Sequence, residues 1–159
     1  GMATGAVAGL VGITPAAGFV SPLSGILIGA ITSGLCYLSV QIKIRISFDD
    51  SLDTFAVHGV GGTVGALLTG LFAKADLIAS HPAGIVLEEQ GRIGLILGQF
   101  QAVLIAYGIA AFGTLFIALT LKLLGCNFRV SEKEELSGLD ISQHGEEAYG
   151  EKTGSPSPV

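Results

Sequence analysis

Charged residues are scarce in this 159-residue chain, at 13% of the total against roughly a quarter in an average soluble protein. This shortage argues against an ordinary soluble domain. Only eight residues are Lys or Arg, and they are spread along the chain, so the basic face that nucleic-acid binding requires is missing. The two cysteines, Cys36 and Cys126, have no CxxC or histidine spacing, so the sequence indicates neither a disulfide framework nor a zinc site, and we expect both to be packing residues.

Three stretches of the chain contain no Asp, Glu, Lys or Arg: residues 1–42, 54–73 and 93–121. A helix needs about 20 apolar residues to cross the ~30 Å hydrocarbon core of a bilayer. Pro15 and Gly18 break the first stretch in two. The sequence therefore predicts an all-α, polytopic transmembrane helical bundle with helices at about 1–14, 18–42, 50–73 and 93–124.

The first predicted helix, at about 20 Å, is too short to span a bilayer. We therefore expect the chain to begin inside a transmembrane helix and to be the C-terminal part of a larger membrane protein. The orientation follows from basic residues beside the spans, which favour the cytoplasmic side. One side receives only Lys74 and Arg92, and the other receives Lys43, Arg45, Lys122, Arg129 and Lys133. This places residues 131–159, with two basic and seven acidic side chains, in a cytoplasmic tail whose end we expect to be disordered.

His58 is the most informative residue of the spans, because it lies well inside the third one. A histidine at that depth faces a partner, a cavity or a transport path rather than lipid, since a polar ring in hydrocarbon is costly. Neutral imidazole both donates and accepts a hydrogen bond, and its pKa of about 6.5 suits proton exchange. Helical spacing puts Thr54, Gly62, Gly65 and Thr69 on the same face as His58. Thr54 is therefore a second candidate for the wall of a pore.

Three carboxylates, Asp49, Asp50 and Asp53, stand at the start of the third span. Carboxylates there cap free N–H groups and meet the positive end of the helix dipole, so we predict a structural role in preference to substrate contact. Small residues also recur at four-residue spacing, which lets helices approach closely in lipid. These pairs are Gly5/Gly9, Gly25/Gly29, Gly61/Gly65, Ala66/Gly70 and Gly94/Gly98.

Three segments identify a family resemblance: residues 1–22 (GMATGAVAGLVGITPAAGFVSP), 48–73 (FDDSLDTFAVHGVGGTVGALLTGLFA) and 137–149 (SGLDISQHGEEAY). They closely resemble the C-terminal part of ammonium transporters of the Amt/Mep/Rh family. That resemblance implies the last four helices of an eleven-helix fold, a homotrimer with one pore per protomer, and a location in the cell membrane with the C-terminus in the cytoplasm. It implies no enzyme activity and no cofactor.

The resemblance also implies a mechanism. Ammonium is deprotonated at the outer mouth, and ammonia passes a pair of histidines, of which His58 is one and the other lies outside this chain. Family members often carry an apolar residue where Thr54 stands. The tail segment resembles one that couples protomers, Ser142 falls where some relatives carry a phosphorylatable threonine, and a PII-type signal protein is an implied partner. We expect this chain alone to be inactive.

Two other functions are compatible with the resemblance. An ammonium sensor would use binding for signalling rather than flux, although such sensors usually carry an added output domain. A Rhesus-type gas channel is nearer in class, but the tail at 137–149 favours the Amt branch. The upstream sequence would best discriminate among these functions, specifically by whether it contains a second intramembrane histidine.

Overall fold

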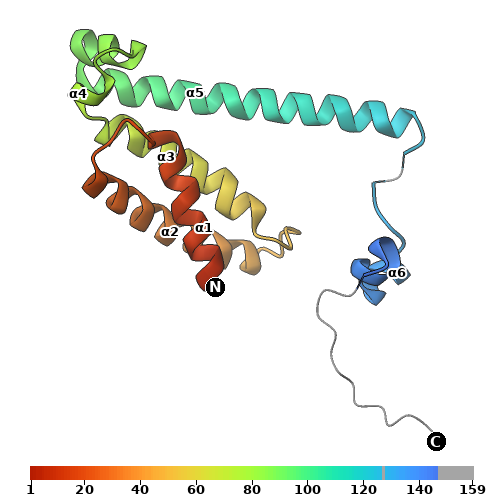
Figure 1. Cartoon of the computed structure of the whole chain (residues 1–159). Helices are drawn as coiled ribbons and strands as arrows, with labels where there is room; N and C mark the ends of the chain where they lie inside the picture. The colour runs from red at the N-terminus through yellow and green to blue at the C-terminus, as the bar shows by residue number, and fades with distance from the viewer. Residues whose placement is uncertain (127, 147–159) are drawn as a thin grey trace, which may run out of the picture. The chain divides into compact units, whose positions relative to one another are not determined.

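The computed structural model describes residues 1–126 and 128–146, and every regular element within them is helical (Figure 1). This confirms the predicted all-α fold class. Contacts divide the chain into two compact units, Gly1–Ala110 and the residues from Ala111 onward, and each is described by itself. The elements are α1 (Met2–Ile13), η1 (Thr14–Ala16), α2 (Pro22–Arg45), η2 (Phe55–Val60), α3 (Gly61–Phe72), α4 (Ala75–Ile78), α5 (Pro82–Leu123), α6 (Glu132–Ser137) and η3 (Asp140–His144).

Three helical segments are long and apolar enough to cross a membrane: Pro22–Arg45, Phe55–Phe72 and Pro82–Leu123. The helix over Met2–Ala16 is apolar but shorter. Most large apolar side chains of α2 and α5 are exposed, including Ile26 at 70% and Phe116 at 72%. Such surfaces are unfavourable in water and favourable in lipid or against further helices, so the chain is built as a multi-pass membrane protein.

The second helix begins at Pro22, four residues later than the sequence predicted. Gly18 has a φ of +85°, which keeps it out of a right-handed helix. The Ser21 side chain accepts a hydrogen bond from the Ser24 N–H at 3.3 Å, and Pro22 takes the first helical position, where no N–H is needed. A serine cap and a proline therefore set this boundary. Of the two cysteines, Cys36 packs in the core as expected, whereas Cys126 is exposed in this chain.

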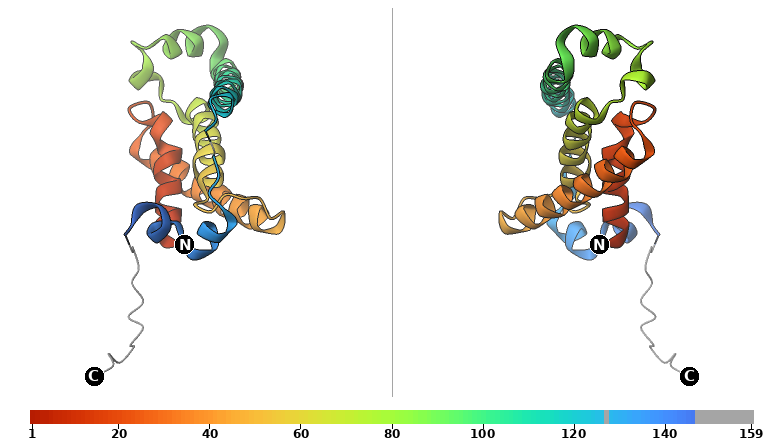
Figure 2. Two further views of the ribbon diagram at one scale, coloured as in Figure 1. Left: turned by 90° about the vertical axis from the view of Figure 1, so that its right-hand side faces the viewer. Right: turned by 90° about the vertical axis from the view of Figure 1, so that its left-hand side faces the viewer.

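The predicted spans at 50–73 and 93–124 leave residues 74–92 as the connecting loop between them, but most of this segment is helical. It contains α4 and the first turns of α5, and both views in Figure 2 show it curving from the end of α3 to the long helix. The interruption in α5 is Gly91, with φ +68° and ψ −168°. Next to it, the Arg92 guanidinium donates to the Ala73 carbonyl oxygen at 2.5 Å, just beyond the C-terminal end of α3. This hydrogen bond joins α5 to the end of α3.

Helices α1, α2 and α3 pack together through small residues (Figure 1). A Cβ placed on Gly65 of α3 would lie 2.3 Å from the Gly12 carbonyl oxygen of α1, so the two backbones touch. Gly9 of α1 faces Gly29 of α2, and the Ser33 hydroxyl donates to the Gly5 carbonyl oxygen at 2.8 Å. Ala8, Cys36 and Val57 form the buried apolar cluster where the three segments meet. Close backbone approach of this kind supplies packing contacts where lipid removes the hydrophobic drive.

In the second unit, the tail carries a short capped helix, α6. Ser131 accepts a hydrogen bond from the Glu134 N–H at 3.4 Å, and the Glu134 carboxylate accepts from the Ser131 N–H at 2.9 Å, which is a capping box. Gln143 in η3 donates to the same carboxylate at 3.1 Å, which ties η3 to α6. The expected disordered end of the tail, residues 147–159, lies outside the described residues.

The capping box makes the tail sensitive to acid. Hydrogen bonds from the Ser131 hydroxyl and then its N–H lower the pKa of Glu134. The contribution of the carboxylate to α6 is therefore present above the ordinary glutamate pKa of about 4.3 and is lost as pH falls through the lowered value. We expect an NMR titration of the Glu134 carboxyl carbon to give a pKa below about 4.3, and Ser131→Ala to raise it. An unchanged pKa in that variant would refute the capping role.

Candidate functional site

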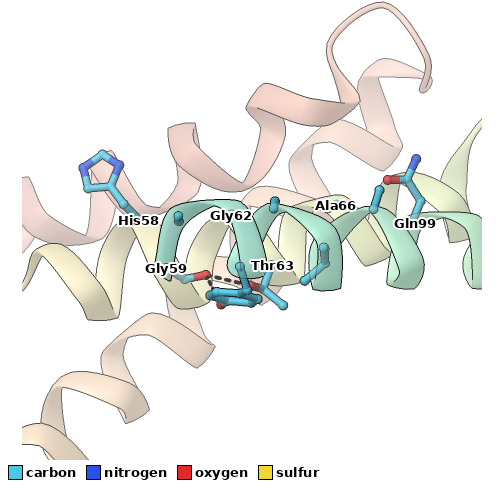
Figure 3. Close-up of a pocket in the computed structure, with 11 residues that line it drawn as sticks. His58, Gly59, Gly62, Thr63, Ala66 and Gln99 are labelled. Atoms are coloured by element: carbon cyan, nitrogen blue, oxygen red, sulfur yellow. Dashed lines mark hydrogen bonds between the residues drawn. The ribbon is translucent and has the colours of Figure 1, made fainter. Parts of the chain in front are cut away.

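A cavity of about 410 Å³ lies beside His58, between the η2–α3 segment and α5 (Figure 3). We call it the His58 cavity. Its wall is made largely of glycine and alanine, with a few polar groups among them. The lining residues include His58, Gly59, Gly62, Thr63 and Ala66 from η2 and α3, and Gln99, Ala102, Ala106 and Tyr107 from α5. An apolar wall with few polar groups is typical of a site for a small molecule.

The sequence around His58 folds so that its neighbours are buried and its own ring is not. Ala56 and Val57 are 1% and 4% exposed, and Val57 belongs to the cluster with Ala8 and Cys36. His58 follows them in η2, a π-helical turn, and its ring forms no hydrogen bond with residues 1–126 and 128–146, the part of the chain that the structure describes. Figure 3 shows the imidazole pointing away from the helix. Burial of the preceding residues thus anchors η2 and leaves the imidazole available to a ligand.

The carboxylates predicted to be structural hold the start of η2. The two Asp50 carboxylate oxygens accept hydrogen bonds from the Thr54 and Phe55 N–H groups, each at 2.9 Å, which is the geometry of a helix cap. Asp53 forms an ion pair with Lys43, whose side chain is 14% exposed, and Lys43 also donates to the Asp50 carbonyl oxygen. These contacts join the end of α2 to the start of η2, and they move the helix start to Phe55 from the expected position near residue 50.

The structure separates residues that helical spacing placed on one face. His58 and Gly62 line the cavity, but Thr54 is absent from its wall. Gly65 packs on Gly12 of α1, and Thr69 is 5% exposed. The wider turn of η2 takes residues at four-residue spacing out of alignment, because a π-helix bonds residue i to i+5. The shared face that the spacing predicted is therefore divided between the cavity and the core.

Three polar residues of the cavity wall were not singled out from the sequence: Thr63, Gln99 and Tyr107. Gln99 and Tyr107 stand in the uncharged run 93–121, where few side chains can form hydrogen bonds. A polar side-chain group inside a membrane span needs a hydrogen-bond partner or a cavity. The presence of such groups in this uncharged run could therefore have identified Gln99 and Tyr107 as candidates.

Ser142 lies in the tail, apart from the cavity wall. Its hydroxyl donates to the Gly138 carbonyl oxygen at 2.8 Å, and the Glu134 carbonyl oxygen lies at 3.5 Å. The side chain is therefore used within the α6–η3 segment, and its hydroxyl is on the exposed side of the chain.

Comparisons with known proteins all point to one family. Residues 1–149 match the model of the Ammonium Transporter Family. The chain is 41% identical over 150 residues to an ammonium transporter of Bacillus subtilis, covering 94% of this chain and 36% of that protein. It is 37% identical over 168 residues to the ammonium transporter MEP2 of Saccharomyces cerevisiae, covering all of this chain and 33% of that protein. The crystal structure of Saccharomyces cerevisiae Mep2 superposes with a TM-score of 0.60, covering 94% of this chain and 34% of that one. The chain thus spans about a third of the length of these relatives.

Proposed function

This chain belongs to the ammonium transporter family, and from that premise we propose that the protein containing it carries ammonium across a membrane. The observation that carries the proposal is His58. It lies in an apolar segment of membrane-spanning length, Phe55–Phe72, lines a cavity, and has an imidazole whose hydrogen-bonding groups are open to a ligand. A small polar solute can use those groups without meeting a fixed charge.

The transported species, in this proposal, is ammonia. A bare cation in an apolar path carries a large desolvation cost, whereas a neutral molecule does not. Ammonium therefore gives up its proton before it reaches His58, the proton crosses separately, and a second histidine outside this chain pairs with His58. Potassium has no proton to give up and is rejected. The mostly glycine and alanine wall of the His58 cavity supports this order of events, since it offers little to replace the hydration of an ion.

The remaining proposals concern assembly and regulation. We propose that the protein forms a homotrimer in the cell membrane. In this proposal the tail from residue 131 lies in the cytoplasm, because basic residues gather on that side of the spans. The tail binds a PII-type signal protein. Phosphorylation of Ser142 would remove the hydroxyl group that donates to the Gly138 carbonyl oxygen, and it would add nearly two negative charges beside the acidic α6. The lost hydrogen bond and the charge repulsion would open the α6–η3 segment.

Flux measurements on the full-length protein in liposomes test the proposed function. An inward ammonium gradient should produce a saturable flux, and an equal potassium gradient should not. Flux no greater than in empty liposomes would refute transport, and ammonium binding without flux would favour a sensor. We expect the 159-residue chain alone to give no flux, because the His58 cavity is walled by η2, α3 and α5 alone within the described residues.

A further inference from the structure

A small hydrogen-bond network joins α5 to the residue that follows His58. The Gly59 carbonyl oxygen accepts from the Thr63 hydroxyl at 2.7 Å and from the Tyr107 hydroxyl at 3.2 Å. The two hydroxyls lie 2.6 Å apart, which is itself hydrogen-bond distance (Figure 3, dashed lines). The two hydroxyl groups have two hydrogens for three contacts. One hydroxyl therefore donates to the Gly59 carbonyl oxygen while the other donates to the first hydroxyl, and the two can exchange these roles. The carbonyl of Gly59 keeps a donor in both arrangements.

The position of this network ties it to His58. Gly59 belongs to η2, the π-helical turn that also carries His58, and no side chain of its own restrains it. Thr63 comes from the same segment, one turn further on. Tyr107 comes from α5, 44 residues beyond Thr63, and reaches across the wall of the His58 cavity. Tyr107 is therefore the contact through which α5 acts on the backbone beside the imidazole.

On one side, η2 is held by the burial of Ala56 and Val57 and by the cap from Asp50. After His58, the buried Gly61 packs near Cys36 and Gly65 contacts the Gly12 backbone, both on the side of α1 and α2. On the side of α5, the phenol of Tyr107 adds a restraint on the Gly59 carbonyl itself, and because its ring is rigid, that carbonyl is fixed relative to α5. A turn held at both ends presents its imidazole in one direction, which a relay of small polar molecules requires.

We propose that Tyr107 is a positioning residue for ammonium transport: its hydroxyl, with that of Thr63, fixes the Gly59 carbonyl and thereby the orientation of the His58 imidazole. The proposal rests on the proposed function, in which His58 contacts the transported molecule. Tyr107 also lines the His58 cavity, but its hydroxyl is bonded to Gly59 and Thr63, and we therefore assign its effect to the orientation of His58.

The test uses the full-length protein with Tyr107→Phe, which removes one hydroxyl and keeps the ring. The matched control is Tyr37→Phe, because Tyr37 on α2 is 63% exposed and its hydroxyl forms no hydrogen bond with the residues that the structure describes. We expect Tyr107→Phe to lower maximal ammonium flux about two- to tenfold, as the loss of one hydrogen bond implies, and to shift the His58 imidazole signals in an NMR spectrum of histidine-labelled protein. Tyr37→Phe should change neither. Thr63→Val should reproduce the effect, and Thr63→Ser should restore it.

Several results would overturn the proposal. Unchanged flux and unchanged His58 signals in Tyr107→Phe would do so directly. A fall in flux with unmoved His58 signals, or one matched by an equal loss of folded protein, would assign Tyr107 to packing alone. The proposed function fails separately: wild-type protein without ammonium flux refutes transport, whereas the shift of the His58 signals by Tyr107→Phe would still establish the positioning contact.

Discussion

Replacing His58 with alanine in the full-length protein should abolish the ammonium-dependent flux or remove its preference for ammonium over potassium. The imidazole is the ionisable side chain that an apolar segment of 18 residues presents to the His58 cavity. Without it, ammonia would lose its hydrogen-bonding partner at that depth, and the space left by the ring would admit water, which lowers the barrier to ions. We expect a loss of at least about tenfold in flux or in selectivity, because positioned proton-exchanging groups contribute about 10²–10⁴-fold in related chemistry.

The measurement is electrical current across protein-containing membranes under ammonium and potassium gradients. His81→Ala is the matched control, because His81 lies between α4 and α5 and its ring packs on Phe19 at a centroid distance of 5.2 Å. We expect its current to equal that of the wild type. If His58→Ala transports at the same rate and with the same selectivity, His58 has no role in conduction and the mechanism proposed above is wrong.

Gly65→Ala should destabilise the protein by about 1–3 kcal/mol, which is the usual cost of forcing an extra group into a packed core. The new Cβ would lie 2.3 Å from the Gly12 carbonyl oxygen and 2.9 Å from the Gly12 carbonyl carbon. Both are backbone atoms, so α1 or α3 must shift as a whole. The better helix propensity of alanine offsets at most about 1 kcal/mol of this cost.

Thermal unfolding in detergent, followed by the loss of the native elution peak, measures the effect. Gly34→Ala is the matched control, since a Cβ on Gly34 of α2 would meet no atom within 4 Å. It should unfold at the wild-type temperature or slightly above. Equal unfolding temperatures for the two variants would show that the contact between α1 and α3 contributes little.

The spans themselves could be predicted from the sequence, because a run of twenty residues without charge has few stable environments besides lipid. The helix boundaries that depend on capping, such as the start of α2 at Pro22, could not be predicted in this way. Residues 74–92, between the predicted spans 50–73 and 93–124, were expected to form a loop, yet most of them are helical and Arg92 bonds to the end of α3. Charged residues are compatible with a helix beyond the hydrocarbon, so their presence ends a span without ending a helix.

The sequence predicted His58 itself but not most of the residues that surround it in space. His58 could be selected because an ionisable group inside a span is costly. Its neighbours in space depend on the local geometry: spacing by four assumes a regular α-helix, and η2 is a π-helical turn. Thr54 therefore leaves the predicted face, while Tyr107, distant in the sequence, reaches the Gly59 carbonyl. Neither the irregular turn nor the contact from α5 has a signature in residue spacing.

The contact between Gly12 and Gly65 also bears on how the chain is made. Synthesis proceeds from the N-terminus, so α1 enters the membrane before the backbone that it touches exists. Gly65 follows Gly12 by roughly 50 residues, which a ribosome adds in about 3–10 s at 5–20 residues per second. During that interval Gly12 of α1 lacks the backbone contact that α3 later provides. Assembly of this bundle therefore waits on translation, and a pause between α2 and α3 would prolong the stage at which α1 can associate with the wrong helix.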